Sequence, residues 1–289
     1  MKKLLIAIIS SFLVLQPIQS FAIDGGKEVP GHPRIVSLYF QPENETFKYD
    51  GCSAFLYAPR IVITAAHCLF KPKGSQERIK DFLIFVGKPG AVLQTKGKHI
   101  RAQKVFMPDS YKNERSYWLY NNEDFAVIVT KQPVAKVSRA TPISESELKE
   151  LQSNFGKVLV GGYGLSNEEE RYQNRNGKKY PRLIELNLAS SDYIQIFNMA
   201  DPIEKYGWAM TNPKVGSTCD GDSGAGFFIE NGKKTIYVGL NAWPIGSPNC
   251  WNNQGWKGPG PGGLNRIDPI YNHTDLLDQA FAYEAKTRR

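Results

Sequence analysis

Short runs of apolar residues recur along most of this chain, and clusters of Gly, Pro, Asn or Lys separate them. The runs are rich in β-branched and aromatic residues, which is typical of β-strands. We expect strands at residues 34–40, 53–57, 61–65, 82–86, 125–130, 157–161, 183–188, 226–229 and 235–241. The pattern favours an antiparallel sandwich or barrel over alternating strands and helices.

Turn and helix signals complete this pattern. Residues 230–233 read Glu-Asn-Gly-Lys between two expected strands, and an Asn-Gly pair is a strong hairpin signal. Only the C-terminal end has a clear helical pattern, over about residues 273–286, with Asn272 or Thr274 as its cap. The polar stretches 107–123, 165–181 and 251–263 are expected to form exposed loops or irregular structure.

The first 22 residues have the pattern of a secretory signal peptide. Two lysines precede an apolar run over residues 4–15, and small residues mark a cleavage site between Ala22 and Ile23. The run is too short to cross a bilayer and no later segment approaches the required length, so we expect no stable membrane insertion. The mature chain is expected to begin at Ile23 and to be secreted, either extracellular or periplasmic. The lysine-rich start favours a bacterial source.

Composition narrows the classes of function. The 289-residue chain is 41% hydrophobic and 22% charged, as an ordinary globular protein is. Removal of the signal peptide takes away two of the 36 Lys and Arg residues, so the formal net charge falls from +8 to +6. A basic balance can favour anionic surfaces or acidic partners, although a solvated basic surface without a dedicated partner is the simpler interpretation. No basic stripe is interleaved with aromatic residues, so we expect no nucleic-acid partner.

Four cysteines in an exported chain suggest two disulfides. Three pairings are possible and the sequence alone does not choose among them; the local option joins Cys52 to Cys68 and Cys219 to Cys250. Metal binding is the poorer alternative, because the chain has no CxxC or HExxH motif and its histidines lie far apart. We therefore expect neither a metal nor another cofactor.

Three short segments hold residues suited to nucleophilic catalysis. The glycine-rich stretch TCDGDSGAGFF contains Ser223, and a serine hydroxyl needs a base to take its proton. His67, in VITAAHCLF, follows an apolar strand, whereas the other three histidines lie in or beside loops, turns or caps. Asp124, in NNEDFAVIVT, precedes another apolar strand and could orient the imidazole. Each residue alone has an ordinary structural explanation, but together they point to a catalytic triad.

The three segments, in the order His, Asp, Ser, resemble the chymotrypsin-like (trypsin-like) serine proteases, and the resemblance runs from Ile23 to the C-terminal helix. It implies one protease domain over residues 23–289, built from two six-stranded antiparallel β-barrels at about 35–130 and 150–270. It also implies that His67 is the general base, that Asp124 orients it, and that Ser223 forms an acyl-enzyme intermediate with protein or peptide substrates.

The same resemblance assigns supporting roles. The backbone N–H groups of Gly221 and Ser223 would form the oxyanion hole. One disulfide would lie behind the histidine and the other beside the substrate pocket, in the pairing Cys52–Cys68 and Cys219–Cys250.

The resemblance also implies an activation step. The ammonium group of Ile23, freed by signal removal, would pair with buried Asp222 and order the oxyanion hole. A competing activation bond lies between Arg34 and Ile35. It lacks the glycines that follow Ile23, and the segment fits better as the first strand of the mature domain.

The specificity pocket is expected to be neutral. By resemblance Ser217 lies at its floor, where relatives that select Lys or Arg have an aspartate. Gly262 would belong to an open wall, and Trp243 and Pro244 to the substrate-binding strand. Such a pocket favours large apolar or aromatic side chains. Pro244 and Ala225 depart from the family pattern, and the proline removes a hydrogen-bond donor to substrate.

The alternative function is a binding or adhesion module on the same fold, either non-catalytic or activated by a partner. Proteins of that kind usually lose a member of the triad, and this chain keeps all three. We expect an active serine endopeptidase that is a monomer.

Overall fold

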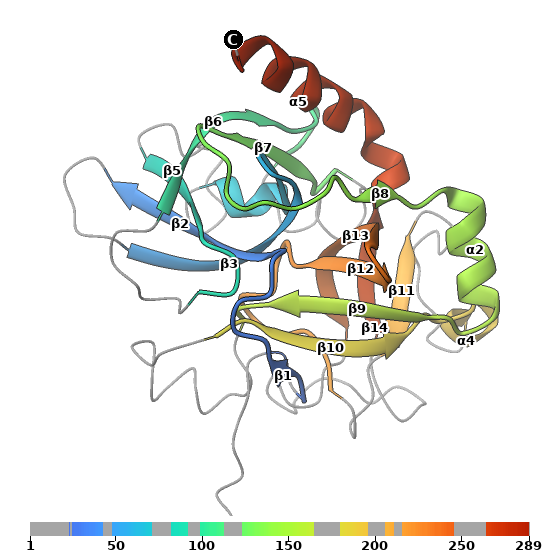
Figure 1. The fold of residues 1–289 in the computed structure, drawn as a ribbon. Coiled ribbons are helices and arrows are strands. Elements are labelled where there is room, and N and C mark those ends of the chain that lie inside the picture. Colours follow the sequence, from blue (N-terminus) through green and yellow to red (C-terminus); the bar gives the residue numbers. More distant parts are fainter. Residues whose placement is uncertain are drawn as a thin grey trace, which may run out of the picture.

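The computed structural model describes residues 23, 25–42, 48–70, 82–91, 99–112, 123–164, 180–195, 206–210, 216–245 and 264–288. In its first half, six antiparallel strands close into a barrel in the order β2-β3-β4-β7-β6-β5 (Figure 1). These strands are β2 (Ile35–Pro42), β3 (Lys48–Ala58), β4 (Ile61–Thr64), β5 (Phe82–Gly87), β6 (His99–Phe106) and β7 (Ala126–Thr130).

The second half is an eight-stranded sheet in the order β1-β10-β9-β12-β13-β14-β11, with β8 paired to β13. Its strands are β1 (Lys27–Glu28), β8 (Thr141–Pro142), β9 (Lys157–Gly162), β10 (Arg182–Asn187), β11 (Gly207–Met210), β12 (Gly226–Asn231), β13 (Lys234–Ile245) and β14 (Leu264–Pro269). A bridge from Leu188 to Ala209 links the end of β10 to β11. The all-β double-barrel prediction is confirmed, although the second half is a half-barrel that adds the two-residue strands β1 and β8.

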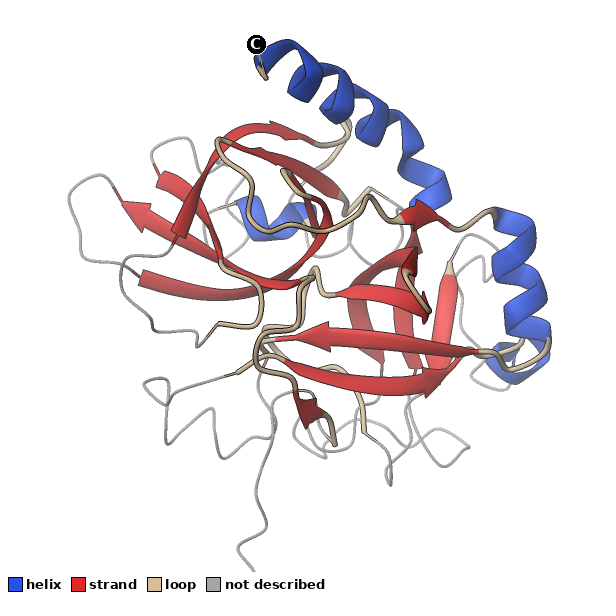
Figure 2. Cartoon of the chain, in the orientation of Figure 1, coloured by secondary structure: helices blue, strands red, loops and turns tan. Residues whose placement is uncertain are grey.

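Strands dominate the described residues, and helices lie mainly at the edges (Figure 2). The helical elements are η1 (Ala66–Leu69), α2 (Glu145–Ser153), α4 (Ser191–Gln195), η3 (Ile270–His273) and α5 (Thr274–Thr287). The C-terminal helix is confirmed as α5. Its expected cap is wrong, because the N-cap residue is His273, whose side chain makes no capping hydrogen bond.

The sequence pattern missed α2, although Ser144 and Glu147 form a capping box at its start. Leu148 is its one fully buried residue, so the helix has no broad apolar face to detect. The pattern also missed β6, whose polar residues leave little alternation. His99, expected in a solvated loop, begins this strand and packs its ring 4.3 Å from that of Tyr39.

The two halves share one core. Phe55 on β3 packs against Phe228 on β12 and Tyr237 on β13, with ring centroids 5.2 Å and 4.7 Å apart. Arg34 is buried before β2, and its guanidinium donates to the Leu56 and Ser138 carbonyls, both at 3.0 Å. Residues 34 and 35 therefore belong to the interior framework. Among the described residues, none of the helices combines the length and apolar character needed to span a bilayer.

His32 lies just before β2, and its burial leads us to expect that the stability of the protein depends on pH. Burial, with a further contribution from Arg34, lowers its pKa from 6.5 to about 4, even though Glu230 lies 3.7 Å from Nε2. The unfolded chain therefore binds this proton more readily than the folded chain. The free energy of unfolding is expected to fall by about 2 kcal/mol from this residue between pH 7 and pH 5.

Urea denaturation at the two pH values measures this difference. The His32→Gln variant serves as the control, because it has no imidazole to titrate and its pH dependence should be weaker by that amount. An unchanged pH dependence in the variant would contradict the assignment.

Candidate active site

His67 and Asp124 lie together because their strands pair. β4 runs into η1, which holds His67, and its last residue, Thr64, pairs with Ala126 at the start of β7, two residues after Asp124. The Nδ1 atom of His67 lies 2.7 Å from Asp124 Oδ2, and the His67 backbone N–H donates to Asp124 Oδ1 at 2.8 Å. The aspartate side chain is 1% exposed and the histidine side chain 15% exposed. A carboxylate accepts hydrogen bonds, so Nδ1 carries the hydrogen in this arrangement and Nε2 is the ring nitrogen with the lone pair.

Ser223 lies in a tight loop anchored to the first barrel. Its carbonyl accepts a hydrogen bond from the Ser53 backbone N–H at 3.0 Å, and the Ser53 hydroxyl donates to the Gly221 carbonyl at 2.8 Å. Gly221 and Gly224 have φ angles of 91° and 78°, which favour glycine. Ser53, a residue that the sequence analysis did not single out, thus fastens the loop on both sides of Asp222.

A disulfide joins this anchor to the histidine. Cys52 and Cys68 are bonded to each other, and they adjoin Ser53 and His67 in the sequence. The Cys52–Cys68 pairing is therefore confirmed. Cys219 is also disulfide-bonded, and its expected partner, Cys250, lies outside the described residues. The two sulfurs of Cys52 and Cys68 lie within 4.8 Å of a His67 ring nitrogen, but sulfurs bonded to each other are not thiolate ligands for a metal.

Asp222, beside Ser223, is fully buried in a cradle of backbone donors. The N–H groups of Gly164 and Cys219 donate to its two carboxylate oxygens at 2.8 Å and 2.9 Å. A Cβ atom at Gly162 or Gly164 would overlap this carboxylate. The GGYG sequence at 161–164 is the signal that could have predicted the cradle. Ile23 is also fully buried in the core, while its expected ion pair with Asp222 stays a prediction.

A polar network backs the predicted pocket. Thr218, next to buried Ser217, places its hydroxyl 2.6 Å from Asn265 Oδ1 and 3.1 Å from Asn241 Oδ1. The Asn241 amide donates to the Asp222 carbonyl at 3.1 Å, so the network reaches the loop that contains Ser223. Sequence reasoning missed Asn265, because only the pairing of β13 with β14 brings it here.

Other predicted pocket residues are less fully described. The backbone of Trp243 and Pro244 lies in β13, where Trp243 pairs with Arg266 and Pro244 with Asn265 of β14. Their side chains, and all of Gly262, lie outside the described part of the chain.

A second histidine–carboxylate pair packs behind Asp124. His273 Nε2 lies 3.2 Å from Asp268 Oδ1, and both side chains are buried. The His273 ring stacks on Phe125, the residue after Asp124, with centroids 4.2 Å apart. The start of the C-terminal helix is thereby joined to the segment that holds Asp124.

Replacing His273 by Ala is expected to lower the free energy of unfolding by about 3–5 kcal/mol, because it leaves the Asp268 carboxylate buried without its partner. Urea denaturation of the single variants and of the double variant with Asp268→Asn measures the coupling. The double variant should be more stable than the sum of the single effects predicts, and strict additivity would contradict the pairing.

Comparison with known proteins defines the class. Residues 23–255 match the family described as Trypsin. The chain belongs to this family of chymotrypsin-like serine proteases. A similar protein is the urokinase-type plasminogen activator of Gallus gallus, 27% identical over 239 residues, which are 78% of this chain and 52% of that protein. The chain thus spans about half the length of this relative.

Proposed function

We propose that this chain is a secreted serine endopeptidase that uses His67, Asp124 and Ser223 as its triad. The observation that carries the proposal is the His67–Asp124 pair, in which two hydrogen bonds fix the imidazole with Nδ1 toward the carboxylate, so that Nε2 acts as the base. Ser223 attacks the substrate carbonyl as His67 takes its proton, and His67 returns the proton to the leaving amine. Water then attacks the acyl-enzyme as His67 takes its proton, and His67 returns that proton to the Ser223 oxygen as the acyl group leaves.

The backbone N–H groups of Gly221 and Ser223 bind the developing oxyanion. The positive φ angle of Gly221 and the bonds from Ser53 support a preorganised loop, because a fixed donor costs no reorganisation during the reaction. The pocket, with Ser217 at its floor and Trp243, Pro244 and Gly262 along its sides, is neutral and favours large apolar residues. No metal takes part.

Reaction with a serine-directed phosphonate tests the catalytic proposal. The mature chain should gain one adduct on Ser223, identified by peptide mass mapping, and it should hydrolyse a mixed peptide library. A chain that neither reacts nor hydrolyses would support the alternative of a binding module instead. Cleavage mainly after charged residues would still support the endopeptidase activity but would overturn the assigned pocket preference.

Activation follows from signal removal. Ile23 becomes the N-terminus, and its ammonium group pairs with Asp222, whose carboxylate is already cradled by Gly164 and Cys219. The intact mass and N-terminal sequence of the active, secreted protein are expected to show a start at Ile23. A start at Ile35 would contradict this, and it would also require removing Arg34 from its buried hydrogen bonds.

A further inference from the structure

Cations gather on one side of the first barrel, away from the nucleophile loop. Residues 99–106, 126–143 and 283–288 include a single acid, Glu284. Against it stand seven cations, which we call the basic face: Arg101, Lys104, Lys131, Lys136, Arg139, Lys286 and Arg288.

Direct contacts bring these three segments together. The Lys131 backbone N–H donates to the Arg101 carbonyl at 2.9 Å. The ring of Phe106 on β6 lies 6.0 Å from that of Tyr283 on α5, and the Arg139 guanidinium lies 3.9 Å above the Phe281 ring. Strand β6, the segment after β7 and the end of α5 therefore form one surface.

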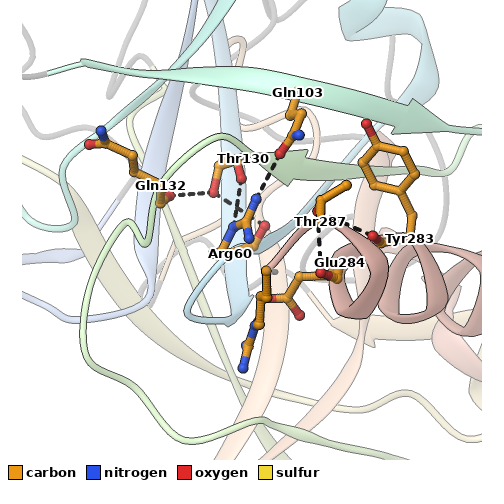
Figure 3. A network of polar contacts seen from close by, with 8 residues as sticks. Arg60, Gln103, Thr130, Gln132, Tyr283, Glu284 and Thr287 are labelled. Atoms are coloured by element: carbon orange, nitrogen blue, oxygen red, sulfur yellow. Dashed lines mark hydrogen bonds and ion pairs between the residues drawn. The ribbon is translucent and has the colours of Figure 1, made fainter.

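Arg60 braces the backbone beneath this surface. It is buried, and it donates to the Thr130 carbonyl at 2.9 Å and to Gln103 Oε1 at 2.7 Å. The Thr130 hydroxyl donates to the Gln132 carbonyl at 2.7 Å. Figure 3 shows this network beside Tyr283, Glu284 and Thr287 of α5. The cations thus project from a fixed framework, so a ligand would not have to order the backbone.

Among the described residues, most of these cations have no acidic partner. Arg288 pairs with Glu284 at 2.7 Å, and no other ion pair involves the basic face among the described residues. On other elements Lys149 pairs with Glu145, and Lys157 with Glu185. Unpaired like charges repel one another, and a bound anion would relieve that repulsion.

The basic face lies far from the chemistry. Asp124 precedes β7 and Lys131 follows it, so the two residues lie at opposite ends of one extended strand, roughly 20 Å apart. A polymer bound along the face would leave the His67 region open.

We propose that the basic face binds a polyanion, a flexible polymer with repeated sulfate or phosphate groups. Its cations lie along a strand and a helix end, which suits a linear ligand. Membrane docking is less suited to this surface, because interfacial binding uses exposed apolar side chains. The exposed large hydrophobic residue of the described part, Phe155, lies at the end of α2 instead.

Binding of the mature chain to a sulfated polysaccharide and to inorganic polyphosphate tests the proposal, with fluorescence anisotropy at 50 and 200 mM salt. The triple variant Lys104→Gln, Lys131→Gln and Lys286→Gln should bind at least about tenfold more weakly, and its log–log salt slope should be shallower by about two to three. The control triple, Lys27→Gln, Lys149→Gln and Lys157→Gln, removes the same charge from β1, α2 and β9 and should keep affinity within about threefold.

Each possible result either supports or overturns the polyanion proposal. Binding of one polymer or both, lost selectively in the first triple, supports the face and identifies the anionic group. Equal loss in both triples, or no binding at 50 mM salt, would overturn it. Thermal unfolding verifies that both triple variants are folded. Hydrolysis of a small peptide should be unchanged in both, so a failure of the polyanion proposal can be told apart from a failure of the proposed protease activity.

Discussion

Replacing Ser223 by Ala is expected to lower kcat on a peptide substrate by about 10⁶-fold, the largest effect of any single change in this chain. Alanine keeps the backbone of the loop, including the N–H groups at 221 and 223, but offers no oxygen to attack the carbonyl. The carbonyl of residue 223 still accepts from Ser53. Substrate binding and stability should therefore change little, so that KM and the melting temperature stay near those of the parent.

The measurement is steady-state hydrolysis together with phosphonate labelling, both of which the variant should lose. Ser153→Ala is the matched control, because that hydroxyl lies on α2 and bonds only to the Glu150 carbonyl among the described contacts. Its activity should equal that of the parent. A Ser223→Ala protein as active as the parent would overturn the assignment of the nucleophile.

Replacing Asp124 by Asn is expected to lower kcat by about 10⁴-fold; the size comes from the trypsin-type template of this same family and not from this chain. The geometry gives the reason. The His67 backbone N–H must face the oxygen of the new amide, which turns the NH₂ group toward Nδ1. Nδ1 must then accept, so the hydrogen moves to Nε2 and the base is lost.

This loss should appear in kcat at pH 7 with little change in KM, measured on the same peptide. Asp192→Asn, an exposed carboxylate on α4, is the control and should keep full activity. A loss of activity explained entirely by unfolding of Asp124→Asn, seen as a lost melting transition, would contradict a role in fixing the tautomer.

Much of the fold could be predicted from local pattern. The expected strands at 34–40, 61–65 and 235–241 correspond to β2, β4 and β13, because short β-branched and aromatic runs between turns have few alternatives. Strand β6 was missed because it exposes Arg101, Gln103 and Lys104, which removes the apolar alternation. Its place in the barrel comes from pairing with β5 and β7.

The candidate site, like the fold, could be predicted from the sequence only in part. Motifs around His67, Asp124 and Ser223 are local, and the resemblance they carry predicts a triad; the Cys52–Cys68 disulfide predicted with it is confirmed. Ser53, the Gly164 cradle of Asp222 and the Asn265 amide lie far from these motifs in the sequence. The Ser53 contact crosses between the two halves, whereas the contacts of Gly164 and Asn265 form within the second half when its distant segments pack together.

The amino-acid sequence by itself therefore determined the class of chemistry, since the identity and order of three reactive side chains are written in short motifs. Tertiary structure alone decided that Nδ1 of His67 faces Asp124, what holds the loop around Ser223, and that six cations from distant segments share one surface with no acidic partner among the described residues. The physical reason is that hydrogen-bond direction and charge proximity depend on distances in space, which strand pairing sets and sequence separation does not reveal.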